Sequence, residues 1–167
     1  NLNATETTQE ITVYPVEKTP IAFKSLKRQK IYDTAVKTLH CCMHEHYEDC
    51  PWREQALYNM DSRNAMLFTY IAFNDYKFAR SNLTLMANGL LDDGLLNICF
   101  PSGVVIPIPS FSTMYPVQVY EYIENSKDLS ILDEVFEPCK KIVETFISKI
   151  DETTALIKQL PAPYWNF

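Results

Sequence analysis

The fold and the chemistry of this chain are both indicated by one stretch, Asp49-Cys50-Pro51-Trp52-Arg53-Glu54-Gln55-Ala56-Leu57-Tyr58-Asn59-Met60-Asp61-Ser62-Arg63. Helical periodicity precedes and follows it, and Pro51 fixes a bend between the two helices. Asp49 and Glu54 can therefore both face the mouth of a helical bundle, with Arg53 between them. Neighbouring carboxyl groups beside an arginine acquire pKa values that are pushed apart, so that one of them stays protonated at neutral pH.

The same stretch combines carboxyl groups with flat apolar side chains, which is the chemistry of a sugar-binding site. A carboxylic acid can protonate a glycosidic oxygen, and Trp52 and Tyr58 offer ring faces to a sugar. The competing interpretation is a solvated loop between helices whose ion pairs have no catalytic purpose, which is the usual outcome for a run of charges. These residues alone leave both interpretations open.

A metal site is a third interpretation, because histidine and cysteine residues are frequent in and before the stretch. The candidate ligands are His40, Cys41, Cys42, His44, His46 and Cys50. The spacing His-x3-His-x-His matches no closed zinc arrangement, and adjacent cysteines would point to different faces of a helix. We therefore expect no metal at this position.

Outside this stretch the pattern is mainly helical. The chain has three glycine residues, where average usage of about 7% predicts about twelve. Its ten proline residues lie mostly between periodic segments, so tight hairpins are disfavoured. The expected helices cover residues 25–46, 53 or 62 to 78, 74 or 80 to 88, 112–125 and 129–150. Pro138 is expected to kink or divide the last helix, and residues 101–109 are expected to form an extended loop.

Composition restricts the class of protein. The 167 residues are 47% apolar and 22% charged, which is typical of one globular domain or a piece of a larger protein. A net charge of −6 disfavours nucleic acid as a partner. No apolar run is long enough to span a membrane. Five cysteines, an odd number, favour reduced thiols and a cytoplasmic location.

The two ends of the sequence suggest a fragment. Residues 1–24 resemble a linker or strand remnant that leads out of an upstream domain. The chain starts without methionine and stops on the aromatic cluster Tyr164-Trp165-Asn166-Phe167, which would be an unusual exposed terminus. We therefore expect that further chain belongs to this domain.

The stretch from Asp49 to Arg63 closely resembles the active-site signature of bacterial α-L-rhamnosidases, glycoside hydrolase family 78. Further motifs follow in the order of the family: Ile108-Pro109-Ser110-Phe111-Ser112, Val117-Gln118-Val119-Tyr120-Glu121-Tyr122 and Tyr164-Trp165-Asn166-Phe167. The resemblance covers residues 23–167. It implies an all-α fold in which residues 25–167 form about the first half of an (α/α)6 barrel, the six-hairpin toroid.

The resemblance also implies an activity, the hydrolysis of terminal α-L-rhamnosyl groups with inversion and without a cofactor. By position, Glu54 resembles the general acid, and Asp49, Arg53 and Asp61 resemble ligands of the sugar hydroxyls. Tyr58, Tyr115 and Trp165 would form an aromatic wall for the methyl group of the sugar. Met60 and Tyr115 stand where many members of the family have glycine and tryptophan, which puts the choice of sugar in doubt.

Inversion requires a second carboxylate, about 6.5 to 9.5 Å from the acid, to activate water. In the family this base lies far downstream, so we expect that these 167 residues alone do not turn over a rhamnoside. A catalytically silent carbohydrate-binding or structural module is the alternative. A protein-interaction domain is a weaker one, and it predicts that the acidic residues do not converge. A half toroid would also leave an apolar face uncovered, which favours a homo-oligomer.

Overall fold

The computed structural model describes residues 8, 10–158 and 160, and they form an all-α fold. The helices are α1 (Leu26–His40), α2 (Asn59–Phe73), α3 (Lys77–Ala87), α4 (Pro109–Ser126) and α5 (Leu132–Ser148), with the short 3-10 helix η1 (Leu129–Ile131) directly before α5. Within the described residues, extended pairing is limited to isolated bridges between loop residues. The mainly helical prediction is confirmed.

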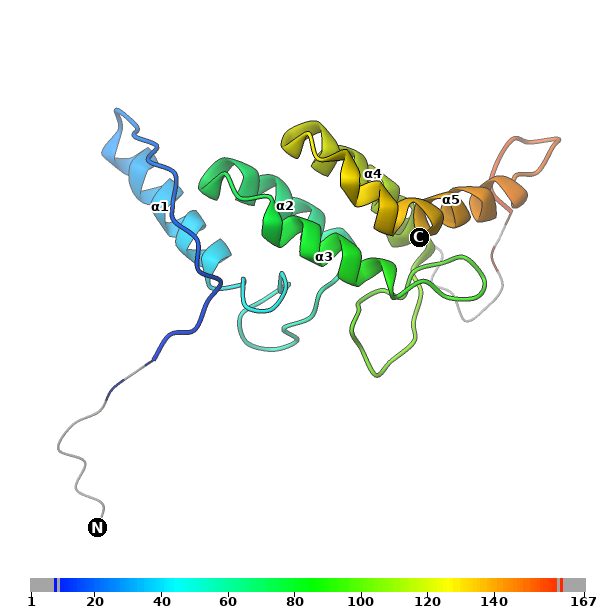
Figure 1. The fold of residues 1–167 in the computed structure, drawn as a ribbon, viewed down its shortest axis with the longest axis horizontal. Helices are drawn as coiled ribbons and strands as arrows, with labels where there is room; N and C mark the ends of the chain where they lie inside the picture. The colour runs from blue at the N-terminus through cyan, green and yellow to red at the C-terminus, as the bar shows by residue number, and fades with distance from the viewer. Residues whose placement is uncertain (1–7, 9, 159, 161–167) are drawn as a thin grey trace, which may run out of the picture.

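The helices pack in pairs along an elongated body. α1 contacts α2, α2 contacts α4, and α3 and α5 contact α4 and each other. Figure 1 shows α1 at one end of the row and α5 at the other. The two long connections, residues 41–58 and 88–108, both lie below the helices in this view. One side of the body therefore carries most of the irregular structure, including the stretch that contains the candidate site.

The first helix is shorter than the predicted 25–46. It begins after Ser25, whose hydroxyl accepts the Arg28 N–H, and it ends at His40. Beyond it the Met43 carbonyl accepts the Tyr14 N–H at 2.7 Å, and the Met43 side chain is fully buried. Because this partner lies almost 30 positions upstream, helical periodicity could not indicate the end of α1.

The second helix begins at Asn59 and ends at Phe73, well before the predicted Phe78. Asn74 follows in the left-handed conformation, with φ 51°, which asparagine tolerates at a helix end. α4 begins at Pro109, one turn earlier than predicted, because proline suits the first position of a helix. α5 is not divided at Pro138 but continues through it, and the break in this segment lies earlier, at η1.

The core lies between α2, α3, α4 and α5. Its fully buried members include Leu83, Tyr115 and Ile142. Complete burial of one large apolar side chain stabilises a fold by about 1.5 to 3 kcal/mol.

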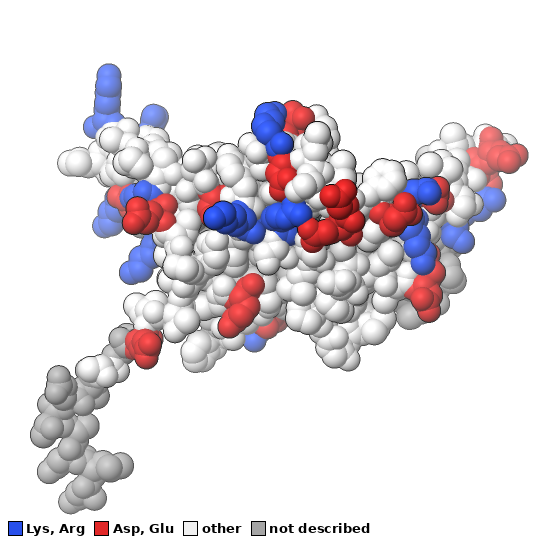
Figure 2. All heavy atoms as spheres, viewed as in Figure 1, with Lys and Arg blue, Asp and Glu red and all other residues white. Residues whose placement is uncertain are grey.

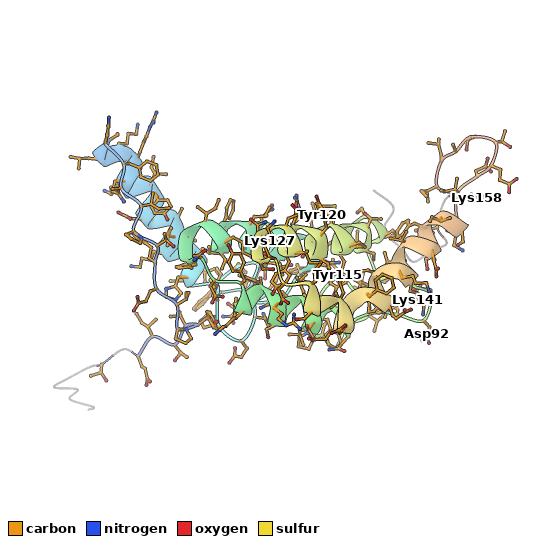
Figure 3. The ribbon with its side chains drawn as sticks, turned by 45° about the horizontal axis from the view of Figure 1, so that its top comes forward. Asp92, Tyr115, Tyr120, Lys127, Lys141 and Lys158 are labelled. Atoms are coloured by element: carbon orange, nitrogen blue, oxygen red, sulfur yellow. The ribbon has the colours of Figure 1, made fainter. Side chains whose placement is uncertain are left out.

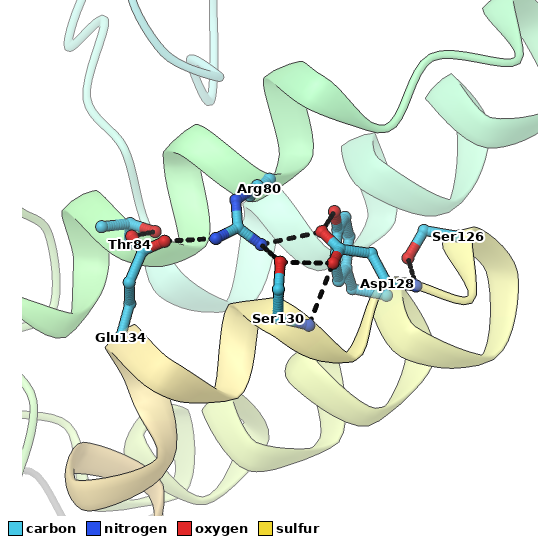
Figure 4. Close-up of polar contacts among 7 residues, drawn as sticks. Arg80, Thr84, Ser126, Asp128, Ser130 and Glu134 are labelled. Carbon is cyan, nitrogen blue, oxygen red and sulfur yellow. Dashed lines mark hydrogen bonds and ion pairs between the residues drawn. The ribbon is translucent and has the colours of Figure 1, made fainter.

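A polar cluster joins α3 to the start of α5, as Figure 4 shows. Arg80 of α3 forms ion pairs with Asp128 and Glu134, and its guanidinium group also donates to the Ser130 hydroxyl. The Tyr122 hydroxyl donates to the same Asp128 carboxylate at 2.8 Å. These contacts fix where η1 and α5 leave α4.

Candidate functional site

The candidate site is built on a loop, residues 49–56, that is closed at its base. The Asp49 N–H donates to the Ala56 carbonyl at 3.1 Å, and the Ala56 N–H donates to Asp49 Oδ1 at 3.0 Å. Residues 51–55 between them are exposed, and 89% of the Trp52 side chain surface is accessible. The loop therefore presents its side chains to solvent from a fixed base.

Glu54 lies in the exposed part of this loop. Arg53 Nη2 donates to Glu54 Oε1 at 2.5 Å, and the Glu54 N–H donates to Cys50 Sγ at 3.4 Å. The next residue, Gln55, has φ 50°, a left-handed conformation that non-glycine residues adopt at a cost in energy. Such strain concentrates at functional sites, and here it turns the chain immediately after Glu54.

Tyr58 is extended and pairs with the other long connection through a bridge to Cys99. On either side of it, the Asn59 N–H donates to the Ile98 carbonyl at 3.1 Å and the Phe100 N–H to the Leu57 carbonyl at 3.4 Å. Burial and a hydrogen bond to Glu54 raise the pKa of Tyr58 to about 12. The hydroxyl therefore stays neutral near the Glu54 carboxyl group at physiological pH.

Two further carboxyl groups near Glu54 have pKa values shifted in opposite directions. Restricted hydration, together with the charges of Asp49 and Glu54, raises the pKa of Asp61 above its usual value. Burial opposes ionisation of Asp49 too, but the hydrogen bonds it receives, first from the Ala56 N–H, lower its pKa overall. The site therefore contains one carboxyl group that ionises readily and one that holds its proton longer.

The structure brings five predicted site residues together: Asp49, Arg53, Glu54, Tyr58 and Asp61. Direct contacts or electrostatic coupling link each of them to another member of the group. Asp49, Glu54 and Asp61 are therefore electrostatic neighbours, and their convergence on one cleft, which the protein-interaction alternative denies, stays a prediction.

Tyr115 does not join this group, which corrects its prediction as part of an aromatic wall. Its side chain is fully buried, and its hydroxyl donates to the Leu83 carbonyl of α3 at 2.8 Å. In Figure 3 it lies among the helices, whereas Tyr120 of the same helix lies at their edge. A ring enclosed by α3 and α4 cannot present its face to a sugar. Trp165 and the rest of the final aromatic cluster lie outside the described residues.

Sequence reasoning missed a buried polar network under the site. Gln118 Nε2 of α4 donates to the Asn59 backbone carbonyl at 2.6 Å and to Asn59 Oδ1 at 2.8 Å. The Ser62 hydroxyl donates to the Asn59 carbonyl at 3.0 Å, and all three side chains are almost fully buried. Asn59 and Ser62 lie three positions apart, on one face of a helix, and this spacing was a usable signal, since Asp61 between them is exposed.

The other quoted motifs also have structural contacts. The Ser112 hydroxyl accepts the Leu96 N–H at 2.9 Å, and the Phe111 carbonyl accepts from the Asn59 amide at 2.9 Å. Arg63 of α2 binds Glu121 of α4 through two nitrogen atoms. These contacts join the start of α2 to α4 and so support the loop that carries Glu54.

Two of the histidine residues near the loop have other partners. His44 Nδ1 pairs with Glu48 Oε1 at 2.9 Å, and His46 Nδ1 contacts the Tyr47 carbonyl. In the part of the chain that the structure describes, no three histidine, cysteine or acidic side chains are grouped as metal ligands. None of the described helices is long and apolar enough to cross a membrane.

These observations define a class, an all-α domain of paired helices with a carboxyl-rich site on its loop side. A model of the bacterial α-L-rhamnosidase 6 hairpin glycosidase domain matches residues 24–161. The chain belongs to this family. No match is found among curated proteins.

Solved structures agree with this fold. The rhamnosidase from Klebsiella oxytoca, determined with rhamnose bound, is 23% identical with a TM-score of 0.74, over 84% of this chain and 28% of that one. The GH78 family rhamnosidase of Bacillus sp. GL1 is 21% identical with a TM-score of 0.77, over 84% of this chain and 15% of that one. The chain thus spans less than a third of the length of either relative.

Proposed function

We propose that this chain supplies the general acid, and part of the sugar-binding site, of an inverting glycoside hydrolase that removes α-L-rhamnosyl groups. The observation that carries the proposal is the placement of Glu54 on an exposed loop, bonded to Arg53 and close to Tyr58, Asp49 and Asp61. Membership of the rhamnosidase family and the rhamnose bound by the Klebsiella relative support the choice of sugar.

In this proposal Glu54 protonates the glycosidic oxygen as the bond to the sugar breaks. Arg53 donates to the Glu54 carboxylate that remains after proton transfer. Asp49, which ionises readily, accepts hydrogen bonds from sugar hydroxyls, and Asp61 does so from the first turn of α2. The exposed Trp52 ring offers an apolar face to the sugar ring or its methyl group.

The water-activating base must stand about 6.5 to 9.5 Å from the acid, on the opposite face of the sugar. We propose that a carboxylate outside the residues described supplies it. The 167-residue chain is then expected to bind L-rhamnose without hydrolysing a rhamnoside. Hydrolysis of an aryl α-L-rhamnoside by the purified chain would contradict this part of the proposal.

The central experiment is the substitution Glu54→Gln in a protein that joins this chain to the rest of a six-hairpin domain. We expect aryl α-L-rhamnoside hydrolysis to fall by roughly two to four orders of magnitude, because general acid catalysis is lost. Product anomers followed by NMR should show inversion in the parent protein. Glu45→Gln is the matched control, since Glu45 is an exposed glutamate of the same charged run outside residues 49–56.

A carbohydrate-binding module without catalysis is the second candidate, favoured by the exposed Trp52 ring close in sequence to the readily ionised Asp49, which could hold a sugar without a catalytic step. It predicts L-rhamnose binding that Asp49→Asn weakens, together with no hydrolysis in the longer protein. An active parent protein that Glu54→Gln inactivates would exclude it.

A further inference from the structure

Cys50 occupies a central place in the candidate site that none of the roles assigned above explains. Its sulfur accepts the backbone N–H of Glu54 at 3.4 Å, and its thiol lies close enough to the Asp49 carboxyl group to interact with it. The side chain is half-buried, whereas residues 51–55 are exposed. The Cys50 sulfur therefore interacts with both Asp49 and Glu54.

Some hydrogen bonds of the loop involve the Glu54 backbone and others do not. The paired bonds of Asp49 and Ala56 close the base, and Gln55 Nε2 reaches back to the Pro51 carbonyl at 3.3 Å. Neither of these contacts involves the Glu54 backbone. The hydrogen bond from the Glu54 N–H to the Cys50 sulfur holds the Glu54 backbone directly, immediately before the left-handed residue Gln55.

We propose that Cys50 is a positioning residue, whose sulfur holds the Glu54 backbone so that the carboxyl group stays beside Arg53 and Tyr58. The proposal rests on the proposed function, because it gives a purpose to the orientation of Glu54. An exposed loop leaves a glutamate side chain many orientations, and proton transfer requires one of them. A hydrogen-bond acceptor at position 50 restricts the Glu54 backbone and so reduces the number of orientations open to its side chain.

The sulfur contributes as an acceptor, and this separates the proposal from a simple packing role. Alanine at position 50 removes the acceptor and leaves the Glu54 N–H to water. Serine keeps an acceptor of similar size, although its oxygen reaches less far. The proposal therefore predicts the order wild type, Cys50→Ser, Cys50→Ala for every property that reports on Glu54.

The first test is NMR of the isotope-labelled 167-residue chain and these two variants. Loss of one net hydrogen bond should speed exchange of the Glu54 amide proton by about fivefold in Cys50→Ala, with a shifted side-chain carboxyl resonance. Cys50→Ser should lie near wild type. Cys41→Ala is the control, because Cys41 is also half-buried but lies at the end of α1, outside the loop.

Addition of L-rhamnose separates this inference from the proposed function. If rhamnose shifts the Glu54 resonances in wild type and Cys50→Ser but less in Cys50→Ala, both are supported. If rhamnose shifts nothing in any protein while Cys50→Ala alone frees the Glu54 amide, the positioning role stands and the proposed function fails.

Two results would overturn the positioning role. One is an unchanged Glu54 amide and carboxyl resonance in Cys50→Ala. The other is an equal loss in the alanine and serine variants, which would show that the thiol acts by packing. Should Cys50→Ala not fold, Cys50→Val, which also lacks an acceptor, replaces it: a freed Glu54 amide in this variant but not in Cys50→Ser supports the role, and equal signals in the two variants reject it.

Discussion

Tyr58 and Tyr115 illustrate how two tyrosines assigned to the same aromatic wall differ in the structure. Tyr58 lies beside Glu54 on the loop side, whereas Tyr115 is enclosed in the core with its hydroxyl bonded to the Leu83 carbonyl. The environment of each hydroxyl, and not the residue type, determines what a substitution by phenylalanine should change.

Tyr115→Phe should lower the free energy of unfolding by about 1 kcal/mol, because it removes one buried hydrogen bond. Binding of L-rhamnose should be unaffected, since the ring has no exposed surface. Urea denaturation and a rhamnose titration check the two expectations. Tyr120→Phe, at an exposed position of the same helix, should change neither quantity. Weakened rhamnose binding in Tyr115→Phe would restore Tyr115 to the site.

Tyr58 should titrate at about pH 12, two units above an ordinary tyrosine. Because its pKa is raised in the folded state, its contribution to stability is complete below pH 10 and is lost as the pH rises towards 12. Difference absorbance of tyrosinate, compared between the wild type and Tyr58→Phe, isolates this titration. A Tyr58 step near pH 10 would show that the hydroxyl is neither shielded from water nor bonded to Glu54.

At the scale of elements, all five helices and several of their ends were predictable, such as the start of α1 after Ser25, but the end of α1 and both ends of α2 were not. Apolar spacing indicated all five helices, because one face of each is buried. The end of α1 depends on Tyr14, and the start of α2 depends on Ile98, Phe111 and Gln118, all distant in sequence. The site followed the same rule, since the residues of the loop were predictable but the buried network beneath it was not.

Gln118→Leu should destabilise the junction of α2 and α4 by about 1 to 3 kcal/mol, because the buried Asn59 side-chain oxygen loses its hydrogen-bond donor. Thermal unfolding measures the loss. Hydrogen exchange should show faster exchange at the first turn of α2, with little change in α5. A loss spread evenly over all helices would contradict a local role.

The junction of α3 with η1 and α5 should weaken in acid. Hydrogen bonds, first from Ser130 and then from Tyr122, hold the pKa of Asp128 at about 2. Since this pKa is depressed on folding, the stabilisation is present above pH 4 and is lost as the pH falls towards 2. In Asp128→Asn, the free energy of unfolding should therefore fall less between pH 4 and pH 2 than in wild type, as measured by acid denaturation. The exposed Asp92→Asn should leave the profile unchanged.

At the scale of the whole molecule, both ends of the helix row carry apolar surface. Between α1 and α2 lies a groove of about 170 Å³ lined by Tyr32, Ala35, Val36, Leu39, Phe68, Ile71 and Ala72. At the other end, α5 exposes Phe136, Val143 and Ile147. The surfaces also differ in charge, since α1 has four basic residues and one acid, and its basic side chains are visible in Figure 2. α5 has four acidic and two basic residues beside its apolar stripe.

We therefore predict that the chain self-associates, with the α5 stripe of one copy in the α1–α2 groove of another. Phe68→Glu should shift sedimentation towards the monomer, because it places a charge in the groove. Val105→Glu, in an equally exposed loop position, should not. A wild-type chain that sediments as a monomer at all concentrations would contradict the prediction.

Both long connections lie on one side of the helices, so changes in the connections and changes in the helix packing affect different parts of the molecule. The opposite side has short turns, residues 74–76 and 127–128, where an insertion would disturb helix packing. The loop side can vary in length and side chains while the helices stay in register. Substitutions in the exposed part of the loop side should therefore cost less stability than insertions in the short turns.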